Sequence, residues 1–203
     1  MPKALIATAA ALFVGLSVVA CSNDDESTAT PTTTAPTTGS ETSTSVSSGD
    51  DGAADPSADL PAFMTLPITD VDGVTFTLAD FAGTPVFVQN FATWCTTCRD
   101  QLPKTNDAAA SLGDTAVFLA LSVETDLDAS DVAAYAADNG FDNIRFAVMT
   151  PDMLAAMVEQ FDNSAVNPPS TPHFVVGFDL SVGELKTGST SADDIVSKVS
   201  AVA

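Results

Sequence analysis

A candidate buried strand that leads directly into two closely spaced cysteines constrains this chain more than any other feature. Residues 86–91 read Val-Phe-Val-Gln-Asn-Phe, as a strand covered on both faces would. Cys95 and Cys98 follow at the start of a stretch that is predicted helical from 95 to about 112. Residues three apart lie on one face of a helix, so the two sulfurs can meet in a small ring. The sequence therefore predicts a strand–turn–helix unit with a cysteine pair at the helix N-terminus.

That placement favours redox chemistry for the pair. The unpaired amides and the dipole of a helix N-terminus stabilise a thiolate at Cys95, which can attack a disulfide, and Cys98 can then resolve the mixed disulfide. A purely structural disulfide over two intervening residues would constrain the unfolded chain very little. A zinc site would need four ligands, whereas residues 60–203 offer these two cysteines and His173.

The rest of residues 60–203 alternates between strand and helix patterns. A turn at 70–73 precedes a predicted edge hairpin strand, Thr150 and Pro151 open a helix, Ser130 caps another, and Gly113 and Gly140 end helices. This alternation predicts an α/β fold with a mixed central sheet. The predicted strands are 74–78, 86–91, 115–123, 144–148, 173–178 and 185–187, and the predicted helices are 95–112, 130–139, 151–161 and 191–202.

Residues 1–20 are predicted to be a lipoprotein signal peptide. Lys3 gives the positive start, and residues 4–20 are apolar or small. Seventeen such residues reach only the lower edge of a membrane-spanning length, roughly 17–25 residues, although a plain transmembrane anchor remains the alternative. The ending Val18-Val19-Ala20-Cys21 resembles a bacterial lipobox, so Cys21 is the predicted lipidation site. Lipidation would tether the protein to the membrane outside the cytoplasm.

Residues 21–59 are predicted to be the lipidated cysteine and a disordered linker. Residues 22–59 hold 17 Ser or Thr, eight acids, no base and no aromatic residue, so they cannot bury enough surface to offset the entropy of ordering. Residues 60–203 form the predicted domain, with 19 acids, five bases and a charge of −14. This acidity excludes general nucleic-acid binding and electrostatic docking on anionic lipid.

Residues 60–203 resemble the thioredoxin-like superfamily, and more narrowly the TlpA/ResA-like extracytoplasmic thiol–disulfide oxidoreductases. The segment Phe91-Ala92-Thr93-Trp94-Cys95-x-x-Cys98-Arg99 is similar to that family's active site, and Pro103 to the proline that kinks its active-site helix. Residues 171–179 resemble the loop and strand around its cis-proline, which would be Pro172. The resemblance implies a thioredoxin-like fold with extra N-terminal edge strands.

It also implies site residues. Cys95 and Cys98 would form the redox-active disulfide, and Trp94, Thr171 and Pro172 would contact substrate. The family often carries an acid six residues before the first cysteine, and this chain has Gln89 there. ResA-like members often carry Glu three residues after the second cysteine, and this chain has Gln101 there. Neither side-chain amide accepts a proton at neutral pH. Thr96-Thr97 stands between the cysteines, where Pro is common. Arg99, one helical turn after Cys95, could stabilise the thiolate, but a solvated surface arginine is the favoured interpretation. His173 could lie near the dithiol, but a structural role at the start of a strand is favoured for it.

The function implied is a membrane-tethered exchanger of dithiols and disulfides with exported proteins, with no cofactor, as a monomer. A membrane electron donor or acceptor would recharge it, and cytochrome c maturation is one expected role. One alternative is a Sco-like copper chaperone, although that family has three residues between its cysteines and this chain has two. A second is a peroxiredoxin, which needs Thr three residues before its reactive cysteine, whereas Ala92 lies three residues before Cys95. A third is a binding module with vestigial cysteines. Direction of electron flow is left open by the residues.

Overall fold

The long apolar stretches form a four-stranded sheet in the computed structural model, which describes residues 60–203. The strand order is β5-β4-β3-β6, with β3 (Val86–Phe91), β4 (Val117–Ser122), β5 (Arg145–Val148) and β6 (His173–Val176). β3 pairs in parallel with β4, and β4 with β5, whereas β6 is antiparallel to β3. The mixed sheet predicted from the sequence is confirmed, and β3 is buried along its whole length.

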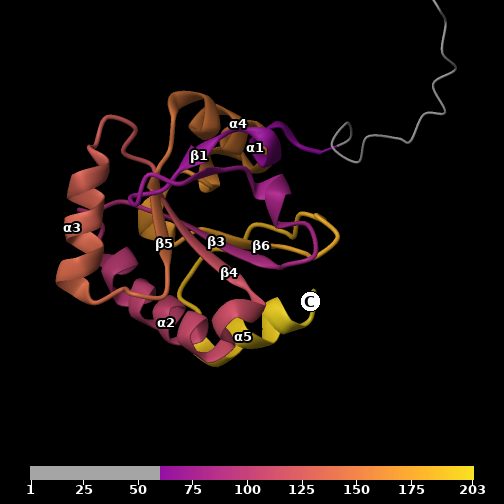
Figure 1. Cartoon of the computed structure of the whole chain (residues 1–203). Helices are drawn as coiled ribbons and strands as arrows, with labels where there is room; N and C mark the ends of the chain where they lie inside the picture. Colours follow the sequence, from indigo (N-terminus) through magenta and orange to yellow (C-terminus); the bar gives the residue numbers. More distant parts are fainter. Residues whose placement is uncertain (1–59) are drawn as a thin grey trace, which may run out of the picture. The chain divides into compact units, whose positions relative to one another are not determined.

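Helices cover both faces of this sheet (Figure 1). On one face, Phe87 and Phe91 of β3 share a core with side chains of α2 (Thr96–Leu112), α3 (Ala129–Asn139) and α5 (Ala192–Ser200). On the other face, Val86 and Val88 pack with α4 (Pro151–Phe161) and the four-residue α1 (Ala62–Thr65). Because side chains alternate along a strand, β3 contributes to both cores, as a central strand must.

A short hairpin lies beside β5. β1 (Ile68–Thr69) and β2 (Thr75–Phe76) are antiparallel, and Asp70 in the turn between them forms a bridge with Ala147. The Asp70 carboxylate, 3% exposed, accepts two hydrogen bonds from Arg145, at 2.7 and 3.1 Å. The sequence predicts extra N-terminal edge strands with a strand at 74–78; in the structure the strand is shorter, and the two strands form a sheet of their own instead of joining the edge of the four-stranded sheet.

Two local predictions are wrong, and one helix was not predicted. Asp128, not Ser130, occupies the N-cap of α3, one residue before the first helical residue. Residues 185–187 form only an isolated bridge from His173 to Lys186, because the chain there pairs for too short a length to make a strand. The helix α1 has no matching prediction. Thr150, by contrast, caps α4 as expected, with its hydroxyl accepting from the Met153 amide at 3.1 Å.

The predicted signal peptide, lipidation site Cys21 and linker lie outside the residues that the structure describes. Within residues 60–203, every helix is too short or too polar to cross a membrane.

Candidate active site

Cys95 and Cys98 form a disulfide at the N-terminus of α2, with their Cα atoms 5.3 Å apart. Cys95 is the N-cap residue, and its sulfur accepts a hydrogen bond from the Cys98 amide at 3.1 Å. This amide is one of the four that a helix N-terminus leaves without an intrahelical partner. In the reduced protein the same amide and the helix dipole would stabilise a thiolate at Cys95.

The pair is held between the sheet and the loop before β6. Both cysteines are buried, and the Cys98 sulfur lies 3.3 Å from the carbonyl oxygen of Pro168. Thr97 Oγ1 donates to the Pro169 carbonyl at 3.0 Å and lies 3.3 Å from the Cys95 sulfur. Pro168 and Pro169 belong to a 3₁₀ turn, Pro168–Ser170, that the sequence analysis did not connect with the cysteines. The Pro168-Pro169 pair just before the predicted loop at 171–179 was the sequence signal that could have indicated this turn.

Thr171 and Pro172 have different environments. Thr171 is buried, has a φ of +48°, and lines a hollow of about 500 Å³ together with Thr97. The Pro172 carbonyl accepts from the Asn90 amide of β3 at 3.0 Å, which ties the loop to the sheet. The structure thus brings Thr171 near the cysteine-bearing turn of α2. Trp94, directly before Cys95, leaves 59% of its surface exposed.

The two glutamines at the expected acid positions have partners of their own. Gln101 is buried; its Nε2 donates to the Thr190 carbonyl at 3.1 Å, and its Oε1 accepts from the Thr190 amide at 2.9 Å and the Ser189 hydroxyl at 3.0 Å. Gln89 Oε1 accepts from the Thr105 hydroxyl at 2.7 Å. Both side chains join α2 to its surroundings, but only Gln101 donates a hydrogen bond that a carboxylate could not make. The Nε2 of Gln89 is buried with no hydrogen-bond partner in residues 60–203.

His173 lies on β6 directly across from Gln89. Its ring stacks on Phe87 with centroids 5.5 Å apart, and Nδ1 lies 3.0 Å from the Thr171 carbonyl, so Nδ1 carries the proton of the neutral ring. Burial lowers the pKa of His173, and the hydrogen bond to the Thr171 carbonyl partly offsets this by raising it. The positive charges of Lys198 and Lys186 lower the pKa of His173 further. His173 is therefore neutral at neutral pH.

One acidic residue that the sequence analysis passed over contacts the active-site turn. Glu124, two residues after the end of β4, accepts from the Thr93 amide at 2.6 Å. Nothing local marked it, because 31 residues separate the two partners. In the described part of the chain, no three His, Cys, Asp or Glu side chains gather as a metal site requires.

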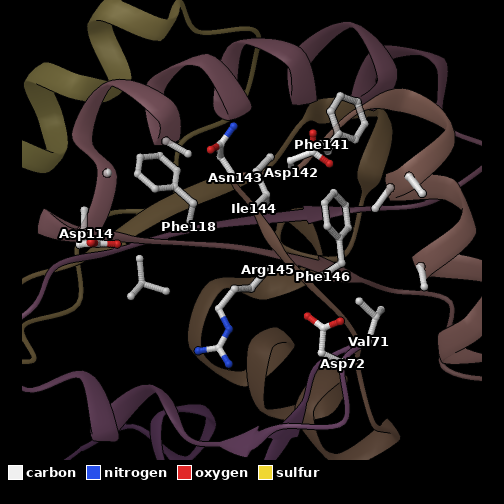
Figure 2. A pocket seen from close by; sticks show the side chains of 17 residues that line it. Val71, Asp72, Asp114, Phe118, Phe141, Asp142, Asn143, Ile144, Arg145 and Phe146 are labelled. Carbon is white, nitrogen blue, oxygen red and sulfur yellow. The ribbon is translucent and has the colours of Figure 1, made fainter.

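The larger hollow, of about 560 Å³, lies at the opposite end of α2 (Figure 2). Its lining includes the rings of Phe118 and Phe146 and the carboxylates of Asp72 and Asp142. Gly113, just past the C-terminus of α2, also lines it. A helix of 17 residues spans about 25 Å, so this hollow is remote from the cysteine pair.

Solved structures share the fold. A thiol:disulfide interchange protein of the thioredoxin family from Chlorobium tepidum matches with a TM-score of 0.58 and 22% identity, over 68% of this chain and 92% of its own. An exposed lipoprotein thioredoxin from Streptococcus pneumoniae matches with a TM-score of 0.55 and 21% identity, over 67% and 98%. BsSco, of the Sco family of cytochrome c oxidase assembly proteins, matches with 0.56 and 20%, over 68% and 90%. No curated protein sequence matches the chain.

The sheet, its helices and a Cys-x-x-Cys disulfide at a helix N-terminus together define a thioredoxin-like thiol–disulfide oxidoreductase. The Redoxin family model matches residues 52–176, more than half of the sequence. The chain belongs to the Redoxin family.

Proposed function

We propose that this protein exchanges disulfides with exported proteins while tethered to the outer side of the membrane. The observation that carries the proposal is the disulfide between Cys95 and Cys98, with Cys95 capping α2. A redox pair so placed has a stabilised thiolate at its outer end and a resolving thiol one helical turn inside. The exposed Trp94 and the hollow lined by Thr97 and Thr171 offer a surface beside the pair for an extended client segment.

The exchange proceeds through a mixed disulfide. When the reduced protein acts as a reductase, the Cys95 thiolate attacks one sulfur of a client disulfide, and the other client sulfur leaves as a thiolate. Cys98 then loses its proton and attacks the Cys95 sulfur, which releases the second client thiolate and forms the Cys95–Cys98 disulfide. Two electrons pass to the client. In the oxidase direction the same steps run backwards.

The reduction potential of the full-length chain tests the proposal. Equilibration against glutathione buffers, followed by acid quench and alkylation, gives the fraction reduced at each ratio. A value near the roughly −270 mV of thioredoxin would support a reductase, with cytochrome c maturation as one role, and a value near −120 mV would support a disulfide-forming oxidase. Absence of a reversible two-electron couple would overturn the exchange function.

The membrane tether rests on the sequence around Cys21. The small and aliphatic residues before this cysteine and the apolar stretch behind Lys3 support lipidation. The match to the Streptococcus pneumoniae protein, described as an exposed lipoprotein, is consistent with such an arrangement. Mass spectrometry of the membrane-fraction protein should find a diacylated N-terminal cysteine, and Cys21→Ser should release the chain from that fraction.

Copper handling is the second candidate, favoured by the fold shared with BsSco and by the buried Nε2 of His173, which has no hydrogen-bond partner in residues 60–203. Anaerobic titration of the reduced protein with Cu(I) separates the two functions. Stoichiometric binding that is lost in His173→Ala would favour copper handling, whereas binding that is unaffected by this change would count against it.

A further inference from the structure

Glu124 connects the end of β4 with the turn that carries the cysteines. One oxygen of its carboxylate accepts from the Thr93 amide at 2.6 Å and from the Thr93 hydroxyl at 2.9 Å. Ser122 completes the contact: its hydroxyl lies 3.4 Å from the same carboxylate oxygen and accepts from the Glu124 amide at 3.2 Å. A half-buried carboxylate with several short hydrogen bonds has a fixed position, unlike an exposed surface acid.

This fixed charge lies close to the reactive sulfur. Thr93 precedes Cys95 by two residues, and two residues of chain span at most about 7 Å. The carboxylate is thus on the order of 10 Å from the Cys95 sulfur. At that distance, with an effective dielectric of about 20, a unit negative charge disfavours a thiolate by about tenfold. The charge therefore opposes the helix N-terminus, which favours the thiolate.

Other charged groups surround the pair. Arg99 follows Cys95 by one helical turn. Arg99 and Glu124 both act on Tyr135 of α3, whose pKa is raised mainly by burial, lowered by Arg99 and raised by Glu124. The positive charge of Arg99 therefore opposes the negative charge of Glu124 in this region. On the other side of α2, Asp100 and Lys104 line the hollow beside Thr97 and carry opposite charges. Among these groups, Glu124 is the one bonded to the backbone of the active-site turn.

We propose that Glu124 is a positioning residue that also biases the cysteine pair toward the reduction of client disulfides. Its hydrogen bonds hold Thr93 and hence the turn that presents Cys95, and its negative charge destabilises the Cys95 thiolate of the reduced protein. Because a less stable reduced form gives up electrons more readily, the carboxylate biases the pair toward reducing client disulfides. This inference rests on the proposed exchange function and adds to it a residue that favours the reductase direction.

The test compares three variants of the full-length chain in glutathione buffers at fixed pH. Glu124→Gln keeps the shape and an oxygen that accepts from Thr93 but removes the charge. We expect its reduced form to be favoured by about tenfold over wild type, which for two electrons is about 30 mV. The rate of Cys95 alkylation by iodoacetamide should also reach its midpoint at lower pH. Asp126→Asn removes the same charge from an exposed position two residues away and should change the equilibrium less than twofold.

Glu124→Asp separates charge from contact, because it keeps the carboxylate but shortens the side chain. Its equilibrium should stay within about threefold of wild type. The proposal is overturned if Glu124→Gln leaves the equilibrium within twofold of wild type, if Asp126→Asn shifts it equally, or if Glu124→Asp shifts it as far as Glu124→Gln. A wild-type chain with no reversible couple would instead refute the exchange function itself, so the two failures are distinguishable.

Discussion

Gln101 gives the sharpest test of how α2 is attached to the loop beside the active site. Its carboxamide makes three hydrogen bonds, one to Ser189 and two to the backbone of Thr190, and the side chain is 1% exposed. A typical hydrogen bond contributes about 1 kcal/mol net, so Gln101→Ala should lower the free energy of unfolding by about 3 kcal/mol. The Thr190 amide and carbonyl would also be left buried without partners. For a domain of this size, the expected fall in Tm is about 10 °C.

Urea unfolding of the full-length chain, followed by circular dichroism, measures this change. Lys104→Ala is the matched control, because its amino group donates to the same Ser189 hydroxyl at 2.6 Å but at an exposed position. The control should cost less than about 0.5 kcal/mol. Gln101→Glu keeps the acceptor, loses the donor toward Thr190 and buries a negative charge beside the Thr190 carbonyl, so it should cost at least as much as Gln101→Ala. Equal stabilities for Gln101→Ala and Lys104→Ala would refute the assignment.

Three further predictions concern burial and charge elsewhere in the domain. The pKa of His173 is lowered in the folded state, so below the ordinary histidine pKa of about 6.5 the unfolded chain binds more protons than the folded chain. The free energy of unfolding should therefore fall as the pH drops below that value. In urea titrations, His173→Gln should flatten this pH dependence. Phe174→Ala, which empties a fully buried site against two other phenylalanine rings, should cost about 3–5 kcal/mol by chemical denaturation; a cost below 1 kcal/mol would contradict that packing. Asp70→Ala removes the acceptor of the Arg145 guanidinium and of the Asp72 and Val74 amides, and the loss of these hydrogen bonds should cost about 3 kcal/mol. Asp72→Asn is an exposed control that should leave the calorimetric Tm within about 2 °C.

Local sequence signals determined the elements and the chemistry of the pair. Thr150 and Pro151 open α4 where expected, and Gly140 ends α3 in the left-handed conformation, because caps and helix ends depend on residues within one turn of each other. The cysteine spacing and the apolar strand before it were sufficient to predict a disulfide at a helix N-terminus. These features depend on near neighbours in the chain, so they can be read from the sequence itself.

Only the tertiary structure decided which distant residues surround the cysteines. Pro168 contacts Cys98 across 70 residues of chain, Glu124 contacts Thr93 across 31, and Gln101 contacts Thr190 across 89. No periodicity or spacing encodes such contacts, because they arise when the β3–β4 and β3–β6 pairings bring separate loops to one end of the sheet. The sequence therefore determined what chemistry the pair can perform, and the fold decided which groups hold and bias it.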